Sequence, residues 1–189
     1  MTVKEIIKNV CIYLGKEELL NSSFFETNGQ ELTKQQTKDI NKMVECLNYV
    51  TEELATEYLP IIKTKQIKLT SGVINLNEID EDLMEIISVK TINGRTLRYL
   101  ISNYKMICLA TNVEISYKVY PKTLDVNSMA ENFGGKISAR VIAYGVASEY
   151  CFLEMLYDDA TLWESRYKNA LLVASRKKGE LKLKKRGWF

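Results

Sequence analysis

Hydrophobic periodicity changes twice along this chain of 189 residues, and its only two prolines, Pro60 and Pro121, lie at the two changes. Before Pro60, apolar residues recur at the three- and four-residue spacing of amphipathic helices. Between the prolines they fall in short segments rich in β-branched and aromatic residues, which is typical of strands. After Pro121 the helical spacing returns. We therefore expect helices from both ends of the sequence, with a β region inserted between them.

Two helices are expected before Pro60. The second is the better marked, because Thr33 and Gln36 have the spacing of a capping box. Between the two helices, residues 16–32 have the composition of a loop, which four apolar side chains would anchor to the body of the protein: Leu19, Leu20, Phe24 and Phe25. The expected apolar faces are Val3, Ile6, Ile7, Val10 and Leu14 in the first helix, and Ile40, Met43, Val44, Leu47, Val50, Leu54 and Tyr58 in the second.

Residues 61–120 contain six strand-like segments in three pairs, each pair separated by a turn signal. The signals are Ser71-Gly72, Asn93-Gly94 and Thr111-Asn112, of which Asn-Gly is the strongest hairpin signal. The expected arrangement is an antiparallel meander. The segment "EIDEDLME" collects five carboxylates. It lacks the glycine and ligand alternation of a calcium loop, so a solvated acidic loop or one-turn helix is favoured over a metal site.

Two further helices are expected after Pro121. The first covers residues 136–156, where Gly145 and Ser148 are small enough to let another helix approach closely. The second begins at Asp158 or Asp159, and its apolar face includes Trp163 and Tyr167.

These elements together predict an α+β fold with three parts. Residues 1–60 and 121–175 form a helical bundle, which is the larger part. Residues 61–120 form a β-meander subdomain inserted between the second and third helices. Residues 176–189 form an extended basic C-terminal arm.

The chain ends on "ELKLKKRGWF", where two large aromatic residues follow a basic run. Residues 176–189 hold seven basic side chains and one acidic one, whereas the rest of the chain has an acidic excess. Exposing a large apolar side chain forgoes roughly 1.5 to 3 kcal/mol of burial, so we expect a partner to cover the aromatics. One interpretation is an arm that docks on another protein subunit through Leu181, Leu183, Lys184, Lys185, Arg186, Trp188 and Phe189.

The alternative interpretation of this segment is nucleic-acid binding, in which the cations neutralise phosphates and the aromatics stack on bases. Salt separates the two interpretations. Binding to nucleic acid weakens steeply as salt rises, whereas an arm anchored by aromatic side chains keeps most of its affinity.

Histidine is absent from the whole chain, which removes the commonest general acid-base group and the imidazole metal sites. No glycine-rich phosphate-binding motif is present either. Carboxylates at Glu53 and Glu57, and at Glu149 and Glu154, could be drawn as a cluster between helices. Solvated or salt-bridged helix faces are the favoured interpretation of these carboxylates. We therefore expect no enzyme activity, no catalytic residue, no metal and no cofactor.

Four scattered cysteines, Cys11, Cys46, Cys108 and Cys151, are expected to be reduced thiols in the core. The apolar stretches are far shorter than the roughly 20 residues that span a membrane, and no signal sequence opens the chain. The sequence thus predicts a protein of a cytoplasm-like compartment with no membrane partner.

The segment "AYGVASEYCFLEMLYDDATLWESRYKNAL" resembles the C-terminal helical hairpin of the head-to-tail adaptor (connector) proteins of tailed bacteriophages. In that hairpin a helix with Ala/Gly and Glu-Tyr precedes a short turn and a helix of the W-x3-Y type, here Trp163 and Tyr167. The opening "VCIYLGKEEL" and the long helix "INKMVECLNYVTEELATEYLP" are similar to the beginning of the tail-tubular adaptors of short-tailed phages, in which a β region follows. The resemblance covers most of the chain in order of elements, through packing patterns and not catalytic signatures.

This resemblance implies a structural virion protein of the neck or tail, assembled in the host bacterial cytoplasm. Such adaptors form a ring, commonly of twelve subunits, beneath the capsid portal protein. The ring extends the channel through which DNA passes transiently, and it provides the platform for the next neck or tail component. The resemblance also implies that the C-terminal arm reaches toward the portal. A nucleic-acid-binding module is the second hypothesis and a carboxylate enzyme is the third.

Overall fold

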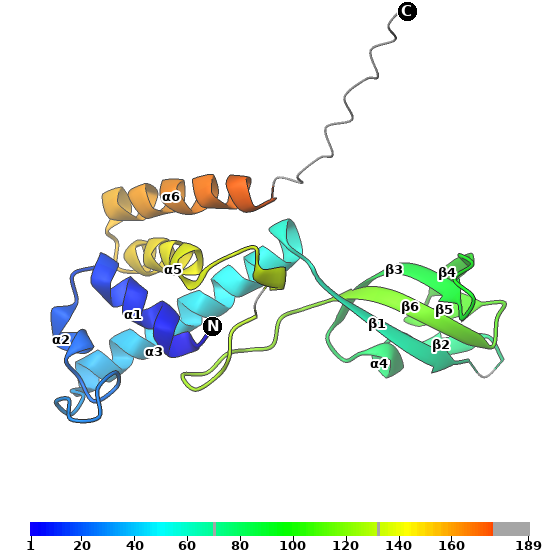
Figure 1. The fold of residues 1–189 in the computed structure, drawn as a ribbon, viewed down its shortest axis with the longest axis horizontal. Helices are drawn as coiled ribbons and strands as arrows, with labels where there is room; N and C mark the ends of the chain where they lie inside the picture. Colours follow the sequence, from blue (N-terminus) through cyan, green and yellow to red (C-terminus); the bar gives the residue numbers. More distant parts are fainter. Residues whose placement is uncertain (70, 132, 176–189) are drawn as a thin grey trace, which may run out of the picture.

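The computed structural model describes residues 1–69, 71–131 and 133–175, which form an α+β protein. Helices from both ends of the sequence pack on one another, and the β region extends away from them along the long axis of the molecule (Figure 1). The helices are α1 (Val3–Tyr13), α2 (Glu17–Leu20), α3 (Lys34–Glu53), α4 (Leu76–Ile79), α5 (Ala139–Leu153) and α6 (Tyr157–Ser175). The strands are β1 (Ile61–Lys68), β2 (Val73–Asn75), β3 (Leu83–Thr91), β4 (Tyr99–Ser102), β5 (Lys105–Cys108) and β6 (Asn112–Val119).

Helix α3 begins where the sequence predicts. The Thr33 hydroxyl accepts a hydrogen bond from the Gln36 backbone at 3.2 Å, and the Gln36 side chain accepts one from the Thr33 backbone at 2.9 Å. The predicted capping box is therefore confirmed. The helix continues as a π-helical turn, Leu54–Tyr58, and ends before Pro60, which cannot donate a backbone hydrogen bond.

The predicted loop between the first two long helices contains one helical turn, α2, so this part of the prediction is incomplete. Its four apolar side chains anchor it as expected. Leu19 is buried, and Leu20, Phe24 and Phe25 are half-buried against the core of the helical part.

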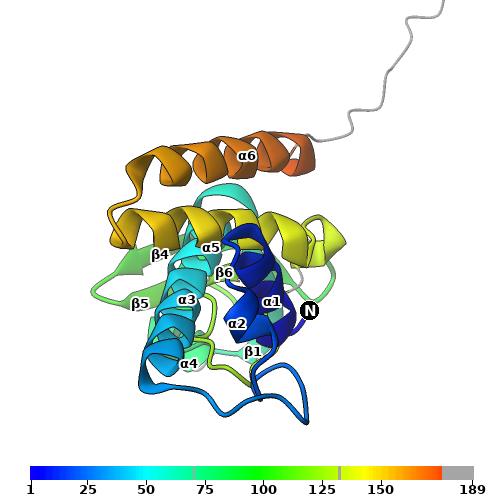
Figure 2. The ribbon, with the colours of Figure 1, turned by 90° about the vertical axis from the view of Figure 1, so that its left-hand side faces the viewer.

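The helices form layers, with α5 between α6 on one side and α1 and α3 on the other (Figure 2). Their shared core holds Cys11, Cys46 and Cys151, and a separate core in the β region holds Cys108. All four are buried free thiols. Ile61, at the start of β1, packs against both cores and so joins them. No helix among the described residues is long and apolar enough to span a membrane.

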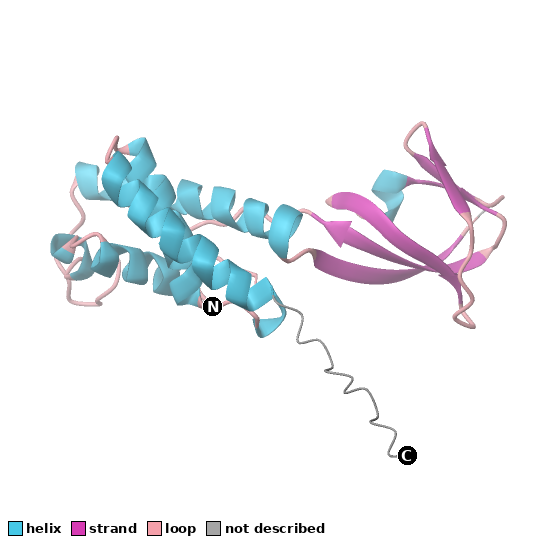
Figure 3. Ribbon diagram, turned by 90° about the horizontal axis from the view of Figure 1, so that it is seen from above, coloured by secondary structure: helices cyan, strands magenta, loops and turns pink. Residues whose placement is uncertain are grey.

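The predicted meander is wrong, because the β region forms two three-stranded antiparallel sheets, in the orders β1-β6-β3 and β2-β5-β4 (Figure 3). The first strand of the region pairs with the last along its whole length, from Ile61 opposite Val119 to Lys68 opposite Asn112. The turns at Ser71-Gly72 and Thr111-Asn112 carry the chain from one sheet to the other and do not close hairpins.

The tight hairpin of the β region joins β4 to β5 through Asn103 and Tyr104, where no turn was predicted. Both residues have positive φ, 49° and 59°. Two successive residues with positive φ form a type I′ turn, whose twist matches the twist of the paired strands. The Asn93-Gly94 turn also forms, with the Thr91 amide donating to the Arg95 carbonyl at 2.9 Å, but the strand that follows pairs in the other sheet.

Strand β1 is an edge of the first sheet and is rich in lysine, with Lys63, Lys65 and Lys68 exposed. Lys63 pairs with Asp80 at 3.1 Å, and Lys65 donates to the Ile79 carbonyl at 2.7 Å. These bonds hold the one-turn helix α4, and the acidic segment after it, against β1. The favoured interpretation of that segment, an acidic loop or one-turn helix, is correct in part: α4 includes its first two residues, Glu78 and Ile79, but its last three, Leu83 to Glu85, begin β3.

Candidate functional site

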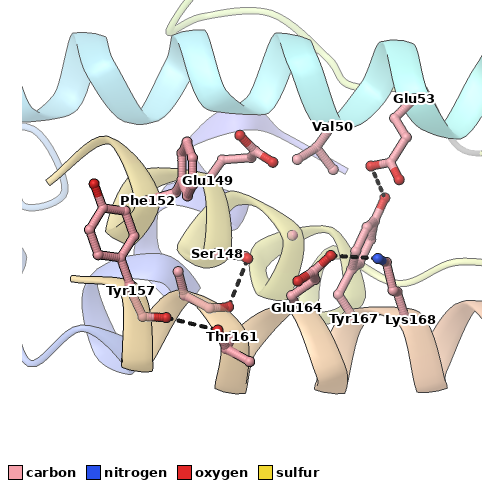
Figure 4. Close-up of a pocket in the computed structure, with 12 residues that line it drawn as sticks. Val50, Glu53, Ser148, Glu149, Phe152, Tyr157, Thr161, Glu164, Tyr167 and Lys168 are labelled. Carbon is pink, nitrogen blue, oxygen red and sulfur yellow. Dashed lines mark hydrogen bonds and ion pairs between the residues drawn. The ribbon is translucent and has the colours of Figure 1, made fainter. Parts of the chain in front are cut away.

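A groove of about 410 Å³ lies where α3, α5 and α6 meet (Figure 4). Gly145 of α5 permits the close approach of the three helices. A Cβ atom at this position would lie 3.0 Å from Cγ1 of Val50 on α3 and 3.1 Å from the ring of Tyr167 on α6. A side chain at position 145 would therefore push α3 and α6 away from α5.

One end of the groove is formed by Tyr167 and Glu53, whose side chains meet from α6 and α3. The Tyr167 hydroxyl donates to the Glu53 carboxylate at 3.4 Å. Burial, and next the neighbouring Glu57 carboxylate, raise the pKa of Glu53 above its ordinary value. Burial and the Glu53 charge raise the pKa of Tyr167, so the phenol keeps its proton and remains a donor.

Two more carboxylates line the middle of the groove, Glu149 from α5 and Glu164 from α6 (Figure 4). Glu164 is paired with Lys168 at 2.5 Å, one turn further along α6. Glu149 has neither a hydrogen-bond nor an ion-pair partner in the part of the chain that the structure describes. Burial, and next the charge of Glu164, raise its pKa. Three carboxylates thus face a single lysine, which leaves the groove negatively charged.

The other end of the groove is apolar. Phe152 of α5 and Tyr157 of α6 meet edge to face, with ring centroids 5.7 Å apart, and both lie beside the groove (Figure 4). They are 59% and 57% exposed, which is high for side chains of this size. The groove therefore runs from a carboxylate-rich end to an aromatic end.

The chemistry that the groove can perform is binding of cationic and apolar groups. No group of three or more His, Cys, Asp or Glu side chains in residues 1–69, 71–131 and 133–175 could hold a metal ion. Of the four carboxylates considered as an interhelical cluster, Glu53 and Glu149 line the groove. Glu57 acts only through its charge on Glu53, and Glu154 forms an ion pair with Lys42 of α3.

The remaining predicted helix-packing residues also lie at contacts between helices. The Ser148 hydroxyl of α5 donates to the Ala160 carbonyl of α6 at 2.9 Å. Trp163 stacks on Tyr13 and on Tyr144, with centroid distances of 5.1 and 5.8 Å, and so joins α6 to α1 and α5. The predicted docking-arm residues, Leu181, Leu183, Lys184, Lys185, Arg186, Trp188 and Phe189, lie outside the described residues.

Two exposed apolar surfaces that were not predicted from the sequence extend beyond the groove, and the first of them shares Phe152 and Tyr157 with its aromatic end. The corner surface surrounds the turn between α5 and α6, and the sheet surface covers the outer face of the small sheet. The corner surface consists of Phe152, Leu153, Met155, Leu156, Tyr157 and Leu162, and the sheet surface of Val73, Leu100, Ile107 and Leu109.

Pairing explains the sheet surface, because Ile107 of β5 lies opposite both Val73 of β2 and Leu100 of β4. The three side chains therefore form one row across the sheet. The opposite face of the sheet buries Ile74, Met106 and Cys108. A strand that is apolar on both faces, such as "MICLA", was the available signal, since a half-exposed strand normally alternates apolar and polar residues.

The corner surface includes an unusual backbone position. Helices α1 and α5 end in the same motif, in which the amide three residues past the last helical residue bonds back to a carbonyl inside the helix. The bonds run from Lys16 to Cys11 and from Leu156 to Cys151, both at 2.9 Å. The residue with positive φ is Gly15 at the end of α1 but Met155 at the end of α5, with φ of 65° and 62°. Glycine is the usual residue here, because a Cβ atom is strained in this conformation.

Neither the comparison with protein-family models nor the search of curated proteins found a match for this chain.

Proposed function

We propose that this chain is a structural subunit of a ring that joins the portal protein of a tailed-bacteriophage capsid to the next neck or tail component. In this proposal the helices form a bundle and the β region is its inserted subdomain. The ring extends the channel for DNA, and the C-terminal arm docks on the portal. The chain acts by contact and has no catalytic role.

The observation that carries the proposal is the separation of the two exposed apolar surfaces. The turn between α5 and α6 lies at one end of the elongated molecule, and β4 and β5 lie toward the other end (Figure 1). Contiguous exposed apolar patches commonly mark interaction sites. Two such patches at opposite ends suit a protein that connects two other components.

Met155 adds support for the corner surface as a contact. Its side chain is 75% exposed and sits on a left-handed backbone that favours glycine. A residue that is both strained and exposed contributes little to the fold of one copy. Its apolar side chain becomes useful when another protein covers it.

Charge also agrees with passage of DNA. Residues 1–175 hold 23 acidic and 19 basic side chains, so this part of the chain carries a net negative charge. A channel wall of this composition makes few phosphate contacts and retards DNA little.

The experiment that tests the proposal is co-purification with the portal protein of the same genome, followed by electron microscopy of the complex. The parent chain is expected to bind at low and moderate salt and to form a ring on the portal. Met155→Lys and Ile107→Lys are each expected to abolish one contact and preserve the fold. Thr64→Lys, an equal charge change at an exposed strand position, is the control and should assemble normally.

Absence of portal binding by the parent chain would contradict the proposal. If, in addition, the chain retained DNA in a strongly salt-dependent manner, the nucleic-acid-binding hypothesis would replace it.

A further inference from the structure

We propose that the groove between α3, α5 and α6 is the docking site for the chain's own C-terminal segment, residues 180–189. The basic residues of the segment would lie against Glu53, Glu149 and Glu164, and Trp188 and Phe189 against the aromatic end. The inference goes beyond the proposed function and does not rest on it, because the contact is made within one chain.

Charge complementarity is the first argument. The groove has three carboxylates and one lysine, and Glu149 lacks a partner among the described residues. The segment 176–189 has seven basic side chains and one acidic one. A partly buried carboxylate that faces another carboxylate is stabilised when a cation enters beside it. Lys168 and Glu164 offset each other in an ion pair at 2.5 Å, so the net negative charge that attracts the segment comes from Glu53 and Glu149.

The order of the two partners is the second argument. Seen from the C-terminal end of α6, the groove presents first Glu53 and Tyr167, then Glu164 and Glu149, and last the rings of Phe152 and Tyr157 (Figure 4). The segment presents its cations first and its aromatics last. A segment that reverses direction after α6 and runs back along the groove therefore matches cations to carboxylates and aromatics to aromatics.

The length of the segment is the third argument. At 1.5 Å per helical residue, Glu164 lies about 16 Å, and Tyr157 about 27 Å, from the end of α6 at Ser175. An extended chain advances about 3.3 Å per residue. If residues 176–179 are used up by the reversal, so that Gly179 lies level with the end of α6, Lys184 would lie about 17 Å back along the helix and Trp188 about 30 Å back. These distances place Lys184 beside Glu164 and Trp188 beside Tyr157.

The segment's own chain is the occupant that the structure favours over a neighbouring copy. Helix α6 forms one wall of the groove, and the segment follows directly from α6. A short connection gives an effective concentration in the millimolar range, which exceeds the concentration of other copies in dilute solution. Any protein that binds the C-terminal segment would then have to displace it from the groove.

The test measures how accessible Trp188 is to acrylamide in the full-length chain. The chain has two tryptophans, so each variant is measured beside its own Trp188→Phe version, which leaves only the emission of Trp163. In the parent, the acrylamide quenching constant of Trp188 is expected to be several-fold lower than that of free N-acetyltryptophanamide. The double variant Glu53→Gln with Glu149→Gln is expected to lose most of that shielding.

The control is Glu26→Gln with Glu31→Gln, which removes two exposed carboxylates outside the groove and should leave Trp188 shielded. Loss of shielding through unfolding is excluded by circular dichroism of each variant. The groove variant is expected to remain folded, because it removes partly buried charge.

Three results would overturn the inference. The first is that Trp188 of the parent is as accessible to acrylamide as the free model compound. The second is that Trp188 is as well shielded in the groove variant as in the parent. The third is that the shielding of Trp188 disappears when the parent is diluted, because the segment in the groove would then come from a second copy of the chain.

Discussion

Tyr167 of α6 donates its hydroxyl to the Glu53 carboxylate of α3 across 3.4 Å, and this is the bond that links the two helices at the carboxylate-rich end of the groove. Tyr167 is 3% exposed and lies against Gly145 of the helix between them. A single phenol of α6 thus contacts both other helices that form the groove.

Tyr167→Phe is expected to lower the free energy of unfolding by about 1 kcal/mol, because the half-buried Glu53 carboxylate loses a donor and the ring itself remains. The pKa of Glu53 should rise further, since the Tyr167 hydrogen bond lowers it in the parent. Urea denaturation and carboxyl NMR titration measure the two effects. An unchanged Glu53 titration would contradict the assigned hydrogen bond.

Glu149→Gln is expected to stabilise the protein at neutral pH. Burial and Glu164 raise the pKa of Glu149 above 4.5 in the folded state, so the folded state binds more protons than the unfolded state between 4.5 and the raised value. Stability therefore falls as pH rises through that window, and the variant removes this loss. Unfolding measured from about pH 4 to 7 should show a difference that grows with pH. Glu26→Gln should show none.

Gly145→Val is expected to destabilise the protein by about 1–3 kcal/mol, because its side chain must displace Val50 or the Tyr167 ring. The matched control is Ser165→Val at an exposed position of α6, which should stay within about 0.5 kcal/mol of the parent. Chemical denaturation of both variants checks this. Equal stability of the two would show that α5 can move away from its neighbours without loss.

Met155→Gly is expected to raise stability by about 1 kcal/mol, since glycine adopts the left-handed backbone without strain. The reciprocal change Gly15→Met should lower stability by a similar amount, because α1 ends in the same motif. Thermal unfolding of the two variants tests both signs. Destabilisation by Met155→Gly would mean that contacts of the methionine side chain outweigh the backbone strain.

The thiols should be unreactive in the folded protein. Burial raises the pKa of Cys11 to about 11 and that of Cys46 to about 12, and all four cysteines are buried. Ellman's reagent is expected to react slowly under native conditions and to find four thiols in denaturant. Rapid native reaction of even one thiol would contradict its burial.

The sequence predicted the helices well because their signals are local. A capping box at Thr33 and Gln36 and an apolar face with a period of 3.6 residues determine where a helix lies and which side it buries. The packing positions at Gly145 and Tyr167 could be recognised for the same reason, although their contact with each other depends on the fold.

Strand pairing could not be predicted in the same way. Turn residues such as Ser71-Gly72 indicate where the chain changes direction, but not which strand it meets next. Pairing of β1 with β6 joins residues that are more than 40 positions apart in the sequence, such as Lys68 and Asn112. The turn at Asn103 and Tyr104 was missed because neither residue is glycine. Glu53 and Glu149 were considered as an interhelical cluster, but Glu164 was not, because the sequence does not show which faces of separate helices meet.

The lysines of β1 affect whether copies of the protein can aggregate through this strand edge. A bare strand edge is a template on which another strand can add, and repeated addition leads to fibrils. Lys63, Lys65 and Lys68 place like charges wherever two such edges would meet. This edge therefore disfavours the addition of a strand from another copy, and the route to fibrils is opposed at β1.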